Sequence, residues 1–220
     1  MNLALFDLDN TILAGDSDYN WSRFLIKEGY LDAAIHAEKN EKFYADYKEG
    51  NLDIFAFVEF QFKPLARNPR KVLDQLLHKY IEEIIKPMIT EKAYALVKKH
   101  QDDGDLLIVI TATNSFITKP IAQIFGIQNL IGTDPEEKDG EFTGKVSGTP
   151  SFKEGKVTRL EEWLKNKKLS LSGFEKSYFY SDSHNDLPLL KKVTHPVVVD
   201  SDDILKEYAK SQGWPQISLR

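Results

Sequence analysis

The sequence predicts an α/β protein, with a Rossmann-like, doubly wound parallel sheet and an inserted helical segment. Five short apolar runs are typical of strands that are buried on both faces. Helical patterns lie between most of these runs, and such alternation is typical of a parallel sheet with helices on both faces. We also expect a hairpin at residues 140–148, where apolar side chains alternate. The expected strands are residues 3–6, 106–110, 129–131, 178–180 and 196–199.

The helices expected around this sheet have recognisable ends. Thr90 is a candidate cap for the helix that precedes the second strand. Residues 154–166 carry apolar side chains at three- and four-residue spacing, which indicates an amphipathic helix. Ser201 is a candidate cap for a last helix that ends at Gly213.

The stretch 14–86 interrupts the alternation, since it contains no convincing strand and is rich in aromatic residues. Asn68 followed by Pro69 predicts a helix start, with asparagine as the cap and proline at the first helical position. Trp21 and Phe55 each begin an apolar stripe at helical spacing, and a third stripe follows Pro69. We therefore expect a small helical module inserted after the first strand.

This organisation divides the chain into two expected units. Residues 1–13 and 87–220 would form the sheet-containing core, and residues 14–86 would form the inserted helical module. A chain of 220 residues is long enough for such a core with an insertion.

Composition excludes several classes of function. The net charge is −5 and the isoelectric point is near 5.6, which argues against a general nucleic-acid binder and against docking on an anionic membrane. The chain contains no cysteine, so disulfides, thiolate metal sites and cysteine nucleophiles are excluded. We find no signal peptide and no apolar stretch long enough to span a bilayer, and we therefore expect a cytoplasmic protein.

Two aspartates, Asp7 and Asp9, directly follow the first expected strand and precede Thr11. In an open parallel sheet, ligands bind beyond the carboxyl ends of the strands. Two carboxylates at such a place repel each other unless a cation or a proton neutralises them, and Mg²⁺ fits because it prefers hard oxygen ligands. The alternative is that these residues only open a turn.

Polar residues also occur after two other expected strands. Thr111 precedes a helix start, where a hydroxyl and free backbone N–H groups can bind phosphate, and its alternative is an ordinary helix cap. Lys156 opens the helix at residues 154–166 and is either a phosphate ligand or a solvated charge. Asp182 and Asp186 form a second acidic cluster after the fourth strand.

Together these positions resemble the four motifs of the haloacid dehalogenase (HAD) superfamily, and specifically its subfamily IB branch related to phosphoserine phosphatase. The first motif of that family is Asp-x-Asp-x-Thr, the second a serine or threonine, the third a lysine and the fourth a pair of acids. The helical module lies between the first two motifs, where this branch has its C1-type cap. The motif residues of this chain are Asp7, Asp9 and Thr11, then Thr111, then Lys156, then Asp182 and Asp186.

The resemblance implies a Mg²⁺-dependent phosphatase that acts on a small phosphorylated metabolite through an aspartyl-phosphate intermediate. It implies that Asp7 is the nucleophile and that Asp9 is the general acid and base. The metal would be held by the side chains of Asp7 and Asp182 and by the backbone carbonyl of Asp9.

The same resemblance implies roles for further residues. Thr111 and Lys156 would hold the phosphoryl oxygens, and Asn185 would contact phosphate or substrate. Asp186 would lie behind them and orient Lys156 or a metal-bound water.

Substrate specificity is less well defined by the motifs. Asp16 stands where phosphoserine phosphatases have a glutamate that meets the substrate ammonium, and it either does the same or merely caps a helix. The arginine that binds the phosphoserine carboxylate in those enzymes has only the candidates Arg23, Arg67 and Arg70 here. An amino-alcohol phosphate such as histidinol phosphate, which has no carboxylate, is therefore an alternative to a phosphoserine-like substrate.

Other functions remain compatible with the motifs. A phosphotransferase of the same superfamily would pass the phosphoryl group to an alcohol instead of water. A phospho-aspartate signalling domain or a binding module descended from the enzyme are further alternatives, although a signalling receiver is usually shorter and has no inserted module. The sequence predicts no oligomeric state.

Overall fold

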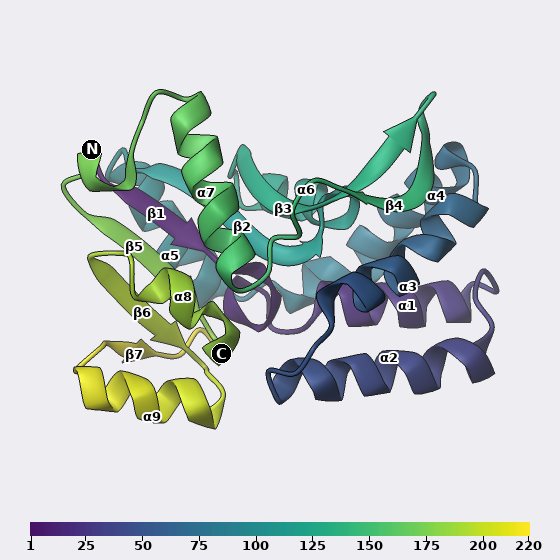
Figure 1. The fold of residues 1–220 in the computed structure, drawn as a ribbon, viewed down its shortest axis with the longest axis horizontal. Helices are drawn as coiled ribbons and strands as arrows, with labels where there is room; N and C mark the ends of the chain where they lie inside the picture. Colours follow the sequence, from purple (N-terminus) through teal and green to yellow (C-terminus); the bar gives the residue numbers. More distant parts are fainter.

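The computed structural model describes residues 1–220, apart from the side chains at positions 35 and 37, and within this range seven strands form one sheet (Figure 1). The strand order is β4-β3-β2-β1-β5-β6-β7. β3 and β4 pair antiparallel as a hairpin at one edge, and the pairs from β3 across to β7 are parallel. The strands are β1 (Leu3–Phe6), β2 (Leu106–Asn114), β3 (Asn129–Lys138), β4 (Glu141–Ser147), β5 (Ser177–Ser181), β6 (His195–Val199) and β7 (Gln216–Ile217).

Helices cover both faces of the sheet, which confirms the predicted doubly wound α/β fold (Figure 1). α5 and α6 pack on one face, and α7, α8 and α9 pack on the other. No helix in the described part of the chain is long and apolar enough to cross a membrane. The helices around the sheet are α5 (Glu91–Asp102), α6 (Ser115–Ile124), α7 (Glu154–Asn166), α8 (Leu187–Leu190) and α9 (Asp203–Gln212).

β1 shows why the sheet carries helices on both faces. Successive side chains of a strand point to opposite faces. Ala4 and Phe6 belong to the hydrophobic cluster under α5 and α6, whereas Leu3 and Leu5 belong to the cluster under α7, α8 and α9. All four side chains are fully buried. A continuous apolar run is therefore the pattern that a central strand requires.

The segment that was expected to be an inserted module contains four α-helices, which lie together at one end of the sheet (Figure 1). Apolar side chains of the first, third and fourth of these helices form one cluster with those under α5 and α6. Trp21, for example, packs edge-on against Phe116 of α6, with 6.3 Å between the ring centroids. The segment thus shares a hydrophobic core with the sheet. Its helices are α1 (Ser17–Lys27), α2 (Ala33–Lys48), α3 (Ile54–Arg67) and α4 (Arg70–Tyr80).

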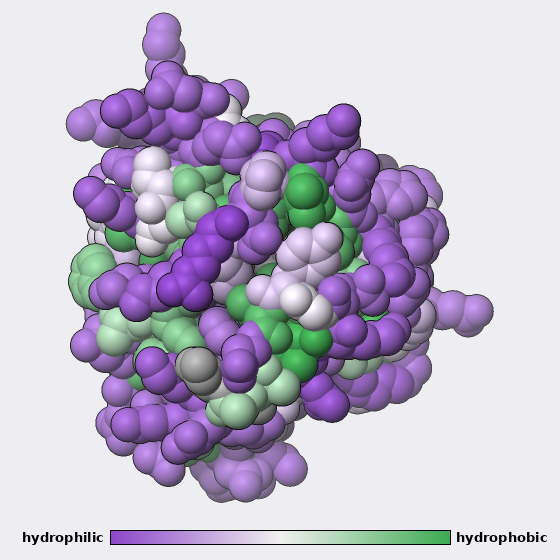
Figure 2. Space-filling model, turned by 90° about the vertical axis from the view of Figure 1, so that its right-hand side faces the viewer, coloured by the Kyte–Doolittle hydropathy of each residue, from purple (hydrophilic) through white to green (hydrophobic). Residues whose placement is uncertain are grey.

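The outer face of this helical segment is mostly polar. Figure 2 shows hydrophilic residues around a smaller group of apolar side chains. In α3, Val58 and Phe62 are buried as their helical spacing predicts. Phe55 was expected in the same buried stripe, but it lies in the first turn of α3 and is 63% exposed.

The start of α4 differs from the sequence prediction. Asn68 does not cap α4, because its side-chain amide donates to the Pro64 carbonyl at 2.8 Å and so closes α3. The backbone N–H of Arg70 is instead bound by the carboxylate of Glu141 in β4, at 2.7 Å. The cap of α4 thus comes from a residue far away in the sequence.

The predicted caps of two other helices had different outcomes. Thr90 caps α5, as expected, by accepting a hydrogen bond from the N–H of Ala93. α9 is capped by Asp202 and not by Ser201, since the Asp202 carboxylate accepts from the N–H of Leu205 at 2.8 Å. α9 ends at the left-handed Gly213, as predicted.

α7 begins at a tight loop. Gly155, in its first turn, lies so close to Pro150 that an added Cβ atom would be 2.1 Å from the Pro150 carbonyl oxygen. Glycine is therefore required at this position. The close approach lets the first turn of α7 bury Lys156, which is 2% exposed.

We predict that Gly155→Ala lowers the free energy of unfolding by about 2–3 kcal/mol, because the new methyl group meets backbone atoms that cannot rotate away. Urea unfolding followed by circular dichroism measures this change. Gly173→Ala is the matched control, since the nearest atom there is the Ser170 hydroxyl oxygen at 3.2 Å. Equal stabilities of the two variants would show that the loop before α7 moves aside without cost.

Candidate active site

The carboxyl ends of three neighbouring strands bring the expected motif residues together. β1 lies between β2 and β5 and runs parallel to both. Asp7 directly follows β1, Thr111 lies in the last part of β2, and Asp182 directly follows β5. Open α/β sheets bind their ligands at this edge.

Lys156 forms a buried ionic network at this edge. Its ammonium donates to Asp7 Oδ1 and to Asp186 Oδ2, at 2.7 Å in both cases. The Ser181 hydroxyl donates to the same Asp186 oxygen at 2.7 Å. Burial alone would lower the pKa of Lys156, but the charges of Asp186 and Asp7 outweigh it and raise the pKa. Lys156 is therefore a cation fixed beside Asp7 by Asp186.

Asp7 and Asp182 also meet at Thr11. The Thr11 hydroxyl lies 3.1 Å from Asp7 Oδ2 and 3.0 Å from Asp182 Oδ1. Burial raises the pKa of Asp7 to about 7, although the charge of Lys156 opposes it. Burial and repulsion from Asp7 raise the pKa of Asp182 well above its usual range. Both carboxylates therefore lack sufficient positive charge nearby.

The charge of this cluster fits a divalent cation. The buried carboxylates of Asp7 and Asp186 bind the ammonium of Lys156, and the half-buried Asp182 lies next to Asp7 at Thr11. When all three acids are ionised, two negative charges are left uncompensated. Carboxylate oxygens are the ligands that Mg²⁺ prefers. Among the described residues, no group of three acidic, histidine or cysteine side chains is arranged to hold a metal ion. A cation here would therefore be held by two carboxylates together with backbone or water oxygens.

Asp9 is held by three donors of its own. Its Oδ1 accepts from the N–H of Ser17 at 2.6 Å, and its Oδ2 accepts from the hydroxyls of Thr113 at 2.8 Å and Thr111 at 3.3 Å. Thr113 was not predicted, because the second strand was expected to end at residue 110 and it continues to residue 114. Thr113 could have been identified from its spacing of two residues from Thr111, since this spacing places both hydroxyls on one face of a strand.

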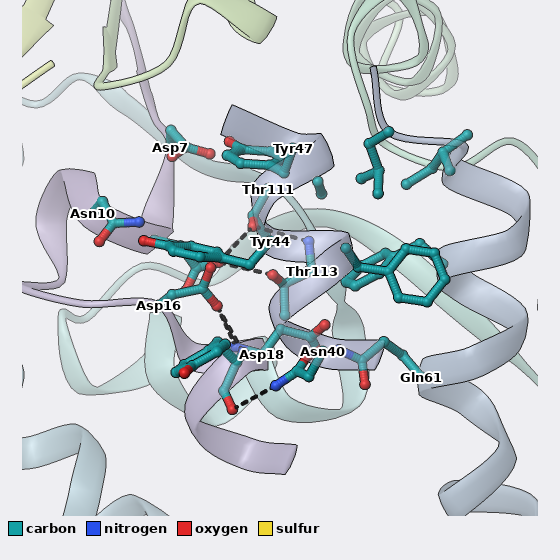
Figure 3. Close-up of a pocket in the computed structure, with 17 residues that line it drawn as sticks. Asp7, Asn10, Asp16, Asp18, Asn40, Tyr44, Tyr47, Gln61, Thr111 and Thr113 are labelled. Carbon is teal, nitrogen blue, oxygen red and sulfur yellow. Dashed lines mark hydrogen bonds between the residues drawn. The ribbon is translucent and has the colours of Figure 1, made fainter. Parts of the chain in front are cut away.

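A pocket opens beside Asp7 and Asp9 under helix α2 (Figure 3). Four residues of α2 line it, and their spacing of three, four and seven residues puts them on one helical face. Burial and the negative charges of Asp182 and Asp7 raise the pKa of Tyr47, which places its hydroxyl near the acidic cluster. No pattern in the sequence predicted that this face lines a pocket. The four residues are Asn40, Phe43, Tyr44 and Tyr47.

Two acids at the start of α1, Asp16 and Asp18, also line the pocket (Figure 3). Asp16 caps α1, because its Oδ1 accepts hydrogen bonds from the N–H groups of Asp18 and Tyr19 at 2.9 and 2.8 Å. A helix cap was one of the two roles predicted for this residue. Burial and the charge of Asp9 raise the pKa of Asp16 to about 7. Burial and the charge of Asp16 raise the pKa of Asp18. This wall of the pocket favours a positively charged ligand group.

No arginine or lysine is among the described residues that line the pocket. The three candidate arginines lie elsewhere. Arg70 pairs with Glu137 of β3 at 3.1 Å, Arg67 lines a groove between α3 and β4, and the Arg23 guanidinium lies 5.7 Å from the ring centre of Tyr19. The pocket therefore offers no cation for a substrate carboxylate beyond the phosphoryl position.

Asn185 connects the sheet edge to α2. Its Nδ2 donates to the backbone carbonyl of Tyr47 at 2.9 Å, and Lys153 makes a similar bond to the carbonyl of Gly50 at 2.7 Å. Asn185 is not among the residues that line the pocket, and its Oδ1 is buried without a partner among the described residues. Its expected contact with phosphate stays a prediction.

The family model of the haloacid dehalogenase-like hydrolases matches residues 4–191. The chain belongs to this family. This confirms the resemblance inferred from the four motifs. Phosphatases among the haloacid dehalogenase-like hydrolases generally use Mg²⁺, in agreement with the charge of the cluster around Asp7.

This haloacid dehalogenase-like hydrolase has relatives that match along its whole length. It is 48% identical over 220 residues to a protein named histidinol-phosphatase from Neisseria meningitidis serogroup C, with 100% of this chain and 99% of the relative covered. The crystal structure of a protein of unknown function from Bordetella pertussis Tohama I is 44% identical, covers 100% of this chain and 99% of its own, and has a TM-score of 0.95.

A more distant structure supports the fold. It shows a phospho-aspartyl intermediate analogue of phosphoserine phosphatase, with 22% identity, coverage of 93% of this chain and 89% of its own, and a TM-score of 0.68.

We predict that Lys156→Met destabilises this hydrolase by about 3–5 kcal/mol in metal-free buffer, because it leaves Asp7 and Asp186 buried without their cation. Lys165→Met is the control on the same helix, where the lysine is exposed, and a change within about 0.5 kcal/mol is expected. Urea unfolding at neutral pH measures both. If the two variants were equally stable, the ionic network would not contribute to folding.

Proposed function

We propose that the protein is a Mg²⁺-dependent phosphatase that hydrolyses the phosphomonoester of a small amino alcohol, such as histidinol phosphate, through an aspartyl-phosphate on Asp7. The observation that carries this proposal is the sign of the pocket charge. Next to Asp7 and Asp9, the pocket is lined by Asp16 and Asp18 and by no arginine or lysine among the described residues. Such a pocket attracts an ammonium group and offers no partner for a carboxylate.

The proposed reaction has two steps. A carboxylate oxygen of Asp7 attacks phosphorus, and the ester bond to the alcohol breaks as Asp9 gives a proton to the leaving oxygen. Water then attacks the phosphoaspartate and passes a proton to Asp9, so that inorganic phosphate leaves and both aspartates return to their first state. The hydrogen bonds from Ser17, Thr111 and Thr113 hold Asp9 in place for this proton exchange.

The remaining motif residues would hold the phosphoryl group. Lys156, oriented by Asp186, and the hydroxyl of Thr111 bind its oxygens in this proposal, with Asn185 as a further contact. The side chains of Asp7 and Asp182 and the backbone carbonyl of Asp9 would hold Mg²⁺. When bound, Mg²⁺ offsets the repulsion between Asp7 and the phosphate dianion.

Asp16 would bind the substrate ammonium. Its Oδ1 is engaged in the cap of α1, and its Oδ2 takes no part in that cap. The name of the relative with 48% identity, histidinol-phosphatase, supports an amino-alcohol phosphate. Phosphoserine fits less well, because its carboxylate would face the acidic wall of the pocket.

We predict that the protein releases phosphate from histidinol phosphate with Mg²⁺ and not with EDTA, and that Asp7→Asn lowers kcat at least about a thousandfold. The amide has nearly the same shape as the carboxylate but is a poor nucleophile. Asp102→Asn, at an exposed position of α5, is the control. Intact-protein mass spectrometry excludes deamidation back to aspartate.

Full activity of the Asp7→Asn protein would refute the aspartyl-phosphate route. Adding glycerol as an acceptor extends the same assay. If most of the phosphoryl group is then recovered as glycerol phosphate, the protein is a phosphotransferase and not a phosphatase.

We predict that Asp16→Asn abolishes the preference for an ammonium group. The comparison is kcat/KM for 2-aminoethyl phosphate and for propyl phosphate, which differ by an ammonium in place of a methyl group. For the natural protein, we expect kcat/KM to be about 10- to 100-fold higher for 2-aminoethyl phosphate than for propyl phosphate. In the variant this ratio should be at least about tenfold smaller. Asparagine caps helices as well as aspartate, so α1 should stay intact. An unchanged ratio would assign the ammonium to another residue.

A further inference from the structure

The end of the pocket away from Asp7 contains a buried carboxylate oxygen without a partner (Figure 3). Asp18 is 5% exposed, and its Oδ2 has no hydrogen-bond partner among the described residues. Its Oδ1 accepts a hydrogen bond from Asn114 Nδ2 at 3.2 Å. We propose that Asp18 is a specificity residue whose free oxygen binds an N–H group on a second, planar part of the substrate, beyond the ammonium.

The neighbouring amide side chains are already paired. Gln61 Oε1 accepts from the Ser22 hydroxyl at 3.0 Å, and Gln61 Nε2 donates to Asn40 Oδ1 at 3.4 Å. Asn40 Nδ2 donates in turn to the backbone carbonyl of Tyr19 at 3.4 Å. These contacts engage one hydrogen of each amide, and hydrogen bonding from the nearby Gln61 partly opposes the rise in the pKa of Asp18. Asp18 Oδ2 itself accepts no hydrogen bond from the described side chains.

The unpartnered oxygen determines which kind of group would bind. A buried carboxylate oxygen that has lost water without gaining a donor is unfavourable. The nearby charge of Asp16 increases this penalty for Asp18. A ligand N–H group removes the penalty, and it binds more strongly when it carries positive charge. The ionised form of Asp18 therefore selects a nitrogen donor, and a positively charged donor stabilises that form. An acceptor such as a carboxylate or a carbonyl oxygen would be rejected by it.

Aromatic side chains form much of the wall of this pocket. Tyr19, Phe43, Tyr44 and Phe57 line it, and the ring centroids of Tyr19 and Tyr44 are 5.3 Å apart. Aromatic faces pack against planar groups and attract cations. A nitrogen heterocycle such as an azole meets both requirements, with a flat ring for the walls and an N–H group for Asp18.

This inference rests on the proposed function and adds a third contact to it. Asp7 would bind the phosphoryl group and Asp16 the ammonium, and Asp18 lies beyond Asp16 along the pocket (Figure 3). Asp16 and Asp18 both belong to the start of α1, so the backbone of this helix fixes the spacing between the two carboxylates. A substrate with an amine and no second donor fills only the first two positions.

The test compares histidinol phosphate with phenylalaninol phosphate. The two share the phosphate and the ammonium, but the phenyl ring has no N–H group. For the natural protein we expect kcat/KM to be about 10- to 100-fold higher for histidinol phosphate. Asp18→Asn should reduce this ratio at least about tenfold. The kcat/KM of the variant for phenylalaninol phosphate should differ from that of the natural protein by less than about threefold, since the phenyl ring makes no hydrogen bond to Asp18.

The orientation of the substituted amide makes the variant informative. Asn114 donates to one oxygen of Asp18 and would hold the new amide oxygen there. The NH₂ group then stands where Oδ2 was, and it repels an N–H donor. Glu59→Gln is the matched control, because it removes an exposed negative charge from α3 and should leave the ratio unchanged.

Two outcomes would overturn this inference alone. If Asp18→Asn lowered kcat/KM equally for both substrates, Asp18 would only support the shape of the pocket. If the kcat/KM ratio of the two substrates stayed unchanged, the free oxygen of Asp18 would contact no ligand. Failure of the proposed function has a different signature. In that case the natural protein releases phosphate from neither ring-bearing compound and does not prefer 2-aminoethyl phosphate to propyl phosphate, and the inference falls with it.

Discussion

The bond of Lys156 to both Asp7 and Asp186 is the contact around which the rest of the site is arranged. A buried ammonium requires anionic partners, and buried carboxylates require a cation. This mutual requirement joins the end of β1, the first turn of α7 and the turn after β5. α7 can approach closely enough because Gly155 has no side chain against the backbone of Pro150. The two negative charges that Lys156 does not balance explain why a divalent cation fits here.

The helical segment is connected to this site by two kinds of contact. α1, α3 and α4 share a hydrophobic cluster with α5 and α6, and no described side chain of α2 belongs to it. Asn185 donates a hydrogen bond to Tyr47 in α2, Lys153 donates one to Gly50 just after α2, and the ring centroid of Tyr47 lies 6.1 Å from that of Phe152. A single hydrogen bond contributes only about 1 kcal/mol, because water replaces it when it breaks. α2 is therefore held over the pocket chiefly by aromatic contacts with α3, such as that of Phe43 with Phe57, whose ring centroids are 5.4 Å apart.

Sequence patterns predicted the strands and helices that are held in place by buried apolar side chains. Strand β1 and the bounds of α7, residues 154–166, follow directly from such patterns. The end of β2 was not predicted, because Thr111 and Thr113 are polar and donate hydrogen bonds to Asp9. The pocket face of α2 was missed for the opposite reason, since an aromatic stripe looks the same whether it faces a core or a ligand. The cap of α4 lay outside any local pattern because its acceptor comes from β4.

The two ends of the pocket have opposite electrostatic requirements. At one end, in the proposed reaction, Lys156 and a metal ion would offset the charge of a phosphate dianion at Asp7. At the other end, burial raises the pKa values of Asp16 and Asp18, and no lysine or arginine among the described lining residues offsets their charge when they are ionised. A substrate with a phosphate and a positive charge is oriented by this asymmetry before any single contact forms. The carboxylate of a phosphorylated amino acid would be repelled by the same wall, so the acids of α1 would favour an amino-alcohol phosphate over a phosphorylated amino acid, which carries one more negative charge.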